Sequence, residues 1–425
     1  MNKQISNQWI KLKFSEIGKL NTSSVDKKIQ LNEQNVLLLN YMDVYRNNFI
    51  SNKINFQKIT ATSKELESFK VNKGDIFFTP SSETPDDIGH SAVIVSELIN
   101  TLQSYHLVKL KLNDEKLMDL NFRGYVFNSE NILNQFRLAA TGSTRFTISL
   151  KEFAKIEVYF PKSIPDQKKI ASILTSVDDV IEKTQSKINK LQDLKKGTIN
   201  KLLIKGIGHT EFKDSELGIV PKSWKIMELS KVSKILSSNV DKKTKENETS
   251  VLLCNYMDVY KNLKITREIN FMKASAKKSE IDKFLIKKDD VIITKDSETP
   301  DDIAISSYVS ENFDNVLCGY HLSIIRPNKS VLDGKFLNFF FKLDYMHHRF
   351  SILANGTTRF GLNLKEVENS KILIPELEEQ KKIANIICSL EDKILIIKKK
   401  LNKYVFIKKS LMQDLLTGKV RVSVN

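Results

Sequence analysis

The feature that most constrains this chain is that its sequence repeats itself. LLLNYMDVY at residues 37–45 returns as LLCNYMDVY at residues 252–260, with an offset of 215. The segment SETPDD at residues 82–87 returns at 297–302 with the same offset. Chance does not produce collinear matches of this length, so the chain is a tandem duplication and each copy must form the same fold.

The first part of each copy, about 160 residues long, alternates short β-rich runs with polar breaks. Residues 75–79 and 290–294 predict equivalent strands. A helical stretch near residues 131–139 is mirrored around residues 335–353, which makes each head α/β or α+β rather than all β. The predicted fold class is therefore α+β with two similar heads.

The second part of each copy is helical and carries a heptad repeat that begins at a QKKIA segment, residues 167–171 and 380–384. The residues at the repeating core positions of each helix form a seam. One lysine interrupts this seam at the same position in both copies. The first seam consists of Ile170, Leu174, Val177, Ile181, Thr184, Ile188, Leu191, Lys195, Thr198 and Leu202. The second consists of Ile383, Ile387, Leu390, Ile394, Ile397, Leu401, Tyr404, Lys408, Leu411 and Leu415, each displaced by 213.

Each seam must pack on another element, either its own head or, as we predict, the seam of the other copy. A helix of about 39 residues would be about 58 Å long. Glycines 206 and 208 end the first helix, and the second head begins by Trp224. The second head therefore most simply lies at the far end of the first helix, and the second helix runs back along it. This predicts an antiparallel, pseudo-twofold coiled coil; a parallel pair requires a fully extended linker.

These patterns divide the chain into four predicted segments. Residues 1–163 form the first head, and residues 164–206 form the first helical spacer. Residues 207–376 form a linker and the second head, and residues 377–425 form the second spacer.

The composition favours a polyanionic partner. The net charge of +16 is large for a globular chain, and Lys and Arg supply much of the affinity for nucleic acid by neutralising phosphates. A Lys-rich, AT-rich genome is the alternative explanation. The three cysteines are far apart and form no CxxC pair, which argues for a reducing compartment and against structural zinc. No apolar signal or 18-residue apolar run occurs, so we expect a cytoplasmic protein without a membrane partner.

A search for catalytic motifs finds none that is convincing. The sequence contains no GxxxxGK[ST] loop and no GxGxxG after a strand. Residues 40–43, Asn-Tyr-Met-Asp, superficially resemble an amino-methyltransferase motif but lack its prolines. The acids Glu83, Asp86 and Asp87, with their repeats at 298, 301 and 302, lack the downstream acid and lysine of a nuclease site. We therefore predict a chain without catalytic residues or a metal site.

Three repeated features are candidates for DNA contact, each with a structural alternative. The acidic SETPDD segment is either a proline turn with caps or a reader of bases, since carboxylates accept from cytosine N4. His106 and His321 are either structural residues with partners inside the protein, or residues that contact a base. The loops 142–146 and 356–360, Gly-Ser/Thr-Thr-Arg-Phe, suit phosphate or guanine contact, unless the arginine only pairs with an acid.

The predicted DNA-binding residues come from these features and from the repeated NYMDVY segment. They are Tyr41, Arg46, Ser82, Glu83, Thr84, His106, Thr144, Arg145, Tyr256, Lys261, Lys295, Ser297, Glu298, Thr299, His321, Thr358 and Arg359.

The chain resembles the specificity subunits of type I restriction-modification systems over nearly its whole length. Residues 202–209 (LLIKGIGH) followed by 212–224 (FKDSELGIVPKSW) resemble the central linker of that family. Residues 379–384 (EQKKIA) resemble its helix start, and residues 415–421 (LLTGKVR) resemble its C-terminus. The first helix start departs slightly, with Pro-Asp-Gln at 165–167.

The resemblance implies two target-recognition domains, each of which reads one half of a split double-stranded DNA site. It implies that the helices set the spacer between the halves and dock two modification (methyltransferase) subunits, with restriction/translocase subunits joining them. S-adenosylmethionine, ATP and Mg are then expected on the partner subunits and no cofactor on this chain. The alternative is a DNA-binding or scaffold subunit of another defence system.

The likeness of the two heads carries a further expectation. Similar heads related by a twofold axis should read similar base sequences on opposite strands, so the target should be nearly palindromic. The loops differ at Pro80-Ser81 against Lys295-Asp296, and at His90-Ser91 against Ile305-Ser306. We expect the half-sites to diverge at these positions.

Overall fold

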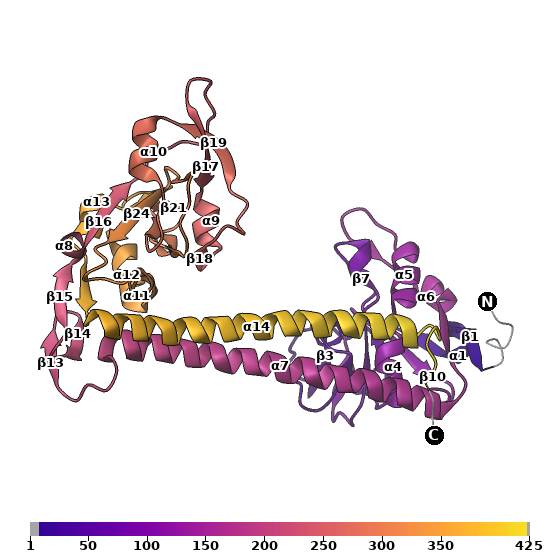
Figure 1. Cartoon of the computed structure of the whole chain (residues 1–425). Helices are drawn as coiled ribbons and strands as arrows, with labels where there is room; N and C mark the ends of the chain where they lie inside the picture. Colours follow the sequence, from indigo (N-terminus) through magenta and orange to yellow (C-terminus); the bar gives the residue numbers. More distant parts are fainter. Residues whose placement is uncertain (1–7, 423–425) are drawn as a thin grey trace. The chain divides into compact units, whose positions relative to one another are not determined.

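The computed structural model describes residues 8–422. The chain forms two compact units, Met1–Ser186 with Lys399–Asn425 and Lys187–Lys398, and each is described by itself. Each unit contains one head, one half of helix α7 (Ile164–Lys205) and one half of helix α14 (Leu377–Leu415) (Figure 1).

The first head is built on a five-stranded sheet and a three-stranded sheet. Their strand orders are β2 (Gly18–Asn21), β10 (Val108–Leu112), β6 (Ile76–Phe78), β8 (Ser91–Ile94), β4 (Phe49–Ile50), and β5 (Gln57–Ala61), β3 (Gln34–Leu39), β9 (Thr101–Gln103). Two short pairs complete it: β1 (Trp9–Lys13) with β12 (Glu157–Pro161), and β7 (Ser81–Ser82) with β11 (Phe146–Thr147). Its helices are α1 (Phe14–Ile17), α2 (Tyr41–Tyr45), α3 (Ser63–Ser68), η2 (Pro85–Asp87), α4 (Leu120–Val126), α5 (Glu130–Ala139) and α6 (Leu150–Lys155).

The second head has the same sheets in the same order. They are β16 (Ser233–Ser237), β24 (Leu322–Pro327), β20 (Val291–Thr294), β22 (Ser306–Val309), β18 (Lys264–Ile265), then β19 (Met272–Ala276), β17 (Thr249–Cys254), β23 (Val316–Cys318). The short pairs are β15 (Lys225–Glu228) with β26 (Lys371–Ile374), and β21 (Asp296–Ser297) with β25 (Phe360–Gly361). The helices are α8 (Leu229–Val232), α9 (Tyr256–Tyr260), α10 (Lys278–Phe284), η3 (Pro300–Asp302), α11 (Gly334–Phe341), α12 (Asp344–Leu353) and α13 (Leu364–Glu368). The predictions of a duplicated head and of an α+β fold are both confirmed.

The linker between α7 and the second head holds a hairpin that the sequence analysis did not foresee, β13 (Phe212–Ser215) with β14 (Gly218–Pro221). It leads to Trp224, whose ring is buried and whose Nε1 donates to Glu379 at the start of α14 at 3.0 Å. Glu379 also accepts from the backbone N–H of Ile207 at 2.9 Å and lies 2.8 Å from Nε2 of His209. One carboxylate therefore joins the end of α7, the linker and the start of α14.

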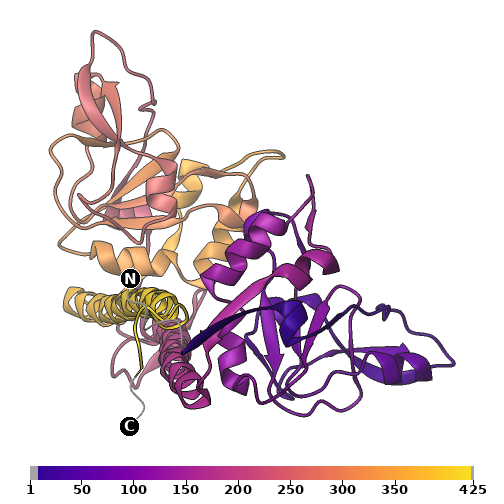
Figure 2. The ribbon, with the colours of Figure 1, turned by 90° about the vertical axis from the view of Figure 1, so that its right-hand side faces the viewer.

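Within each unit the two long helices lie side by side and run in opposite directions (Figures 1 and 2). In the first unit the start of α7, at Ile170 and Leu174, shares a core with Leu415 at the end of α14. In the second unit the roles are exchanged, and Ile199 and Leu203 of α7 share a core with the start of α14. The pair is antiparallel, and the parallel alternative is excluded.

The ends of the seams pack on the heads as well as on each other, so the two alternatives for the seam are not exclusive. The core that contains Ile170 and Leu174 also contains the buried rings of the first head. Ile188, Ile394 and Ile397, near the middle of the helices, are buried without belonging to a head core. Only this middle stretch depends on the helix pair alone.

The two lysines that interrupt the seams each meet an acid of the opposite helix. Lys195 of α7 lies 2.6 Å from Glu391 of α14, and Lys408 of α14 lies 2.6 Å from Asp178 of α7. Since both lysines and both acids are displaced by 213 residues, the two ion pairs occupy equivalent positions of the sequence repeat. A half-buried charge opposite a fixed partner favours one register of the helix pair over its alternatives.

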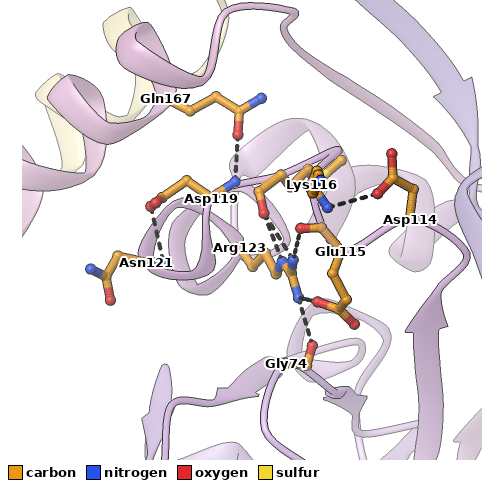
Figure 3. A network of polar contacts seen from close by, with 9 residues as sticks. Gly74, Asp114, Glu115, Lys116, Asp119, Asn121, Arg123 and Gln167 are labelled. Atoms are coloured by element: carbon orange, nitrogen blue, oxygen red, sulfur yellow. Dashed lines mark hydrogen bonds and ion pairs between the residues drawn. The ribbon is translucent and has the colours of Figure 1, made fainter.

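A buried glutamine joins each long helix to its own head. Gln167 accepts from the N–H of Asp119 at 2.7 Å (Figure 3). It also donates to the carbonyl of Pro161 at 2.8 Å. Gln380 repeats this with the N–H of Asp333 at 2.8 Å and the carbonyl of Pro375 at 2.9 Å. Both glutamines are fully buried. The repeated QKKIA segment therefore marks the junction between helix and head.

Beside the first junction, the buried Arg123 ties α4 to the sheet. Its guanidinium donates to the carbonyl of Gly74 at 3.0 Å and of Met118 at 2.9 Å, and to the side chain of Glu115 at 2.5 Å (Figure 3). In the second head a different arginine, Arg326, holds the sheet through both oxygens of the buried Asp290. The heads keep one fold with different internal ion pairs.

We predict that Gln380→Ala lowers the free energy of unfolding of the second unit by about 2–4 kcal/mol, because it leaves a buried N–H and buried carbonyls without partners. Gln167→Ala should do the same to the first unit. Gln413→Ala, at an exposed position of α14, is the matched control. Denaturant unfolding measures all three; equal midpoints for Gln380→Ala and Gln413→Ala would contradict the assignment.

A second stability prediction concerns Lys342, whose Nζ is enclosed and has no hydrogen-bond partner among the described residues. Burial lowers its pKa to about 8, although Glu391 acts in the opposite direction. Because the folded pKa lies below the unfolded one of about 10.4, the unfolded state binds more protons between them. The free energy of unfolding should therefore rise with pH from about 8 to 10.

Lys342→Met should remove this penalty and stabilise the second unit at pH 7 by about 1–3 kcal/mol. It should also flatten the rise between pH 8 and 10. Thermal unfolding of the wild type and of Lys342→Met at both pH values measures this, with the exposed Lys231→Met as control. A lower melting temperature for Lys342→Met at pH 7 would refute it.

Candidate nucleic-acid interface

A two-residue strand pair brings the SETPDD segment and the Gly-Ser/Thr-Thr-Arg-Phe loop together in each head. In the first head Ser82 of β7 pairs with Phe146 of β11. In the second head Ser297 of β21 pairs with Phe360 of β25. Segments about 60 residues apart in the sequence therefore meet at the same place in both heads.

The glycine of each arginine loop is required by the backbone. Gly142 has φ +144° and Gly356 has φ +149°. A Cβ at Gly142 would lie 2.1 Å from the carbonyl oxygen of Arg145, and one at Gly356 would lie 1.9 Å from that of Arg359. Only glycine permits this close turn. The turn leaves the arginine side chain exposed next to Thr144 or Thr358, which are exposed as well.

In the first head, Tyr41 and Arg145 converge on Ser81. The hydroxyl of Tyr41 donates to the carbonyl of Ser81 at 2.8 Å, and Arg145 Nη2 donates to Ser81 Oγ at 3.3 Å. Burial lowers the pKa of His106, and the positive charges of Lys27 and Arg145 add to the effect. Tyr41, His106 and Arg145 therefore belong to one local group.

In the second head, Asp296 takes the place of Ser81 and organises the same group. Its carboxylate lies 2.6 Å from Nδ1 of His321 and accepts from Arg359 Nη2 at 2.9 Å. Burial raises the pKa of Tyr256 to about 12, and the carboxylates of Asp302, Asp296 and Glu298 contribute to the same shift. This acidic surrounding keeps the phenol of Tyr256 protonated.

The acidic segments are proline turns whose last two acids already have partners. Pro85–Asp87 and Pro300–Asp302 form single 3-10 turns. Asp86 lies 3.3 Å from Arg137, and Asp87 accepts from the hydroxyl of Tyr45 at 3.0 Å. Asp301 accepts from Ser351 at 2.7 Å, and the hydroxyl of Tyr260 hydrogen-bonds to Asp302. These contacts support the structural interpretation for the two aspartates of each turn, whereas Glu83 and Glu298 are exposed.

Several of the predicted DNA-contact residues instead form hydrogen bonds within the head. Ser82 Oγ donates to the carbonyl of Thr84, and Ser297 Oγ donates to that of Thr299 at 2.5 Å. The amine of Lys295 donates to the carbonyl of Ser238 at 2.7 Å and to Ser237 Oγ at 3.0 Å. Ser82, Ser297 and Lys295 therefore hold the backbone that carries the other side chains.

The remaining predicted residues, Arg46 and Lys261, are exposed at the ends of α2 and α9. The segment that superficially resembled a methyltransferase motif is the start of α2. The N–H of Asn40 donates to Asp43 at 2.8 Å, and Asn255 repeats this with Asp258 at 2.8 Å. This is a helix-capping arrangement, which explains the repeated Asn-Tyr-Met-Asp.

The sequence analysis missed Tyr45 and Tyr260. Tyr41 stacks on Tyr45 with ring centroids 6.0 Å apart, and Tyr256 stacks on Tyr260 at 5.6 Å. The four-residue spacing inside the repeated NYMDVY segment, on a helix, could have identified both pairs. It also missed that Asp296 connects Arg359 with His321, since residues so distant in sequence meet only in the folded head.

Within residues 8–422 no cluster of three or more His, Cys, Asp or Glu side chains is arranged to hold a metal ion. No helix in the same range combines the length and the hydropathy needed to cross a membrane.

Comparison with solved structures supports the same architecture. The chain is similar to a type I restriction-modification S subunit from M. genitalium, with a TM-score of 0.53, 15% identity, and coverage of 99% of this chain and 98% of the other. A second similar chain comes from a structure titled for complex assembly and conformational transition of the type I R-M system. It has a TM-score of 0.59, 13% identity, and coverage of 96% and 98%. At these identities the likeness shows the fold alone.

Relatives found by sequence are more similar to this chain than these solved structures are. A putative type I restriction enzyme MjaX specificity subunit of Methanocaldococcus jannaschii is 27% identical over 370 residues, covering 84% of this chain and 81% of the relative. The MjaVIII specificity subunit of the same organism is 26% identical over 368 residues, covering 86% and 82%.

The family model for the type I restriction modification DNA specificity domain matches this chain twice, at residues 7–193 and 221–404. The two matches follow the internal repeat, and each contains one head followed by most of a long helix. Together they cover far more than half of the chain. The chain therefore belongs to the family of type I restriction-modification DNA specificity subunits.

Proposed function

We propose that this chain is the non-catalytic DNA sequence-specificity subunit of a type I restriction-modification complex. In this proposal each head reads one half of a bipartite double-stranded DNA target. The observation that carries the proposal is the duplicated loop pair, in which an exposed arginine bonds to the residue just before the SETPDD segment in both heads.

The chemistry of the loop pair suits DNA. Arg145 and Arg359 project from tight turns, and a guanidinium can donate two parallel hydrogen bonds to O6 and N7 of guanine. The neighbouring threonines and the stacked tyrosines offer hydroxyls for phosphates or base edges. The net charge of +16 adds the sequence-independent attraction that nucleic-acid binding requires.

The long helices supply the second part of the proposal, a spacer that also docks partners. Their seam residues are buried or half-buried, yet several large apolar side chains on their outer faces are exposed: Val180 (41%), Leu194 (54%), Leu395 (49%), Ile396 (55%), Val405 (51%) and Phe406 (70%). Such residues on a highly charged helix pair favour protein partners. We assign these faces to two modification (methyltransferase) subunits.

Catalysis in this proposal belongs to the other subunits of the complex. S-adenosylmethionine and methyl transfer to adenine belong to the modification subunits. ATP, Mg, translocation and cleavage belong to restriction/translocase subunits. We place the assembled complex in the cytoplasm.

The proposal is tested by co-expressing the chain with its modification subunits and sequencing the methylated adenines of the host genome. We expect one split motif with similar half-sites on opposite strands, because the two heads carry the same loops. Omitting this chain should abolish the motif, whereas the isolated chain should neither methylate nor cleave DNA. Methylation that persists without this chain would sink the proposal.

A second prediction concerns the arginine loops. Arg145→Ala should weaken specific binding of the complex about 5- to 150-fold, the range expected for one lost bidentate base contact. Arg359→Ala should weaken it less, because Asp296 already engages that guanidinium. Arg267→Ala, which removes an exposed arginine paired with Glu311, should change binding little. Fluorescence anisotropy with a labelled duplex measures the affinities, and equal effects of all three variants would count against base contact.

A further inference from the structure

Ser81 and Asp296 occupy the same position of the loop pair in the two heads and differ chemically. Ser81 is the first residue of β7 and pairs with Thr147, whereas Asp296 is the first residue of β21 and pairs with Gly361. The backbone pairing is the same in both heads, and each arginine loop closes on a glycine with nearly the same φ. The difference therefore lies in the side chain and not in the fold.

Asp296 engages both neighbours through separate oxygens. Oδ2 lies 2.6 Å from Nδ1 of His321, and Oδ1 accepts from Arg359 Nη2 at 2.9 Å. Because a carboxylate only accepts, His321 must donate through Nδ1. Its other ring nitrogen, Nε2, lies 3.5 Å from Arg359 Nη2. The side chains of Asp296 and His321 are only 19% and 13% exposed, so the pair is held from both sides.

Ser81 leaves the equivalent arginine without a carboxylate. The hydrogen bond from Arg145 reaches only the Ser81 hydroxyl, at 3.3 Å. Across residues 8–422 no acid lies within ion-pair distance of Arg145, whereas Arg359 has one at 2.9 Å. The guanidinium of Arg145 thus has no carboxylate partner and can offer its N–H donors to a ligand. The guanidinium of Arg359 already donates to Asp296.

We propose that the position of Ser81 and Asp296 sets the base that each loop pair recognises. In the first head the free Arg145 donates to a guanine. In the second head Asp296 holds Arg359 back and accepts, through its remaining lone pairs, from a base with an exocyclic amino group, cytosine or adenine. This assignment rests on the proposed function and adds the residue that makes two similar half-sites differ.

The test exchanges the two residues in the complete complex. The chain with its modification subunits is used to select bound duplexes from a pool in which both half-sites are randomised. The wild type should select guanine at one position of the half-site read by the first head and cytosine or adenine at the matching position of the other. Asp296→Ser should shift the latter toward guanine by roughly tenfold or more, and Ser81→Asp should lower the guanine preference of the first half-site.

Controls separate a change of specificity from a loss of structure. Asp282→Ser changes an exposed aspartate of α10 in the same head, and should leave both half-sites unchanged. If Asp296→Ser loses its own half-site altogether, Ser81→Asp decides, because it adds an acid beside Arg145 without removing an existing ion pair. Motifs identical to the wild type in both exchange variants would overturn the assignment. A wild-type complex that selects no split motif would instead remove the proposed function itself.

Discussion

The structure depends on the junction at which each long helix begins. A single fully buried glutamine, Gln167 or Gln380, bonds to the backbone of its own head on both sides of the helix start. Burial removes these backbone N–H and C=O groups from water, and the glutamine side chain supplies the hydrogen bonds that they would otherwise lack. The junction is therefore specific as well as stable. Because the junction fixes where the helix leaves the head, the packing of the seam residues follows from it.

The helix pair adds a second constraint through its charges. An apolar seam by itself tolerates neighbouring registers, but Lys195 and Lys408 must each reach an acid of the opposite helix. A shift of one heptad would leave two half-buried ammonium groups without partners, and that costs more than the displaced apolar contacts alone. Because the sequence is duplicated, one lysine position and one acid position of the repeat account for both ion pairs.

The heads show how a duplicated fold can carry different surfaces. Their sheets have the same strand order, although Arg123 stabilises one head and Arg326 the other. The arginine loops close on Gly142 and Gly356 in the same way. The difference between Ser81 and Asp296 changes the polar partner of the loop arginine without changing the strand pairing. The two heads therefore share one fold and differ in the side chains around the arginine loop.

The sequence by itself determined the duplication, the α+β heads, the two long helices and their seam, because repeats and heptad periodicity are local and collinear signals. It also identified the Gly-Ser/Thr-Thr-Arg-Phe loop, since a glycine followed by hydroxyls and an arginine is unusual within a strand-rich head. The tertiary structure alone decided that Ser82, Ser297 and Lys295 support the loop, that Asn40 and Asp43 cap a helix, and that Asp296 joins His321 to Arg359. The physical reason is that a side chain's partner is set by which strands pair, and strand pairing joins residues that no sequence spacing relates.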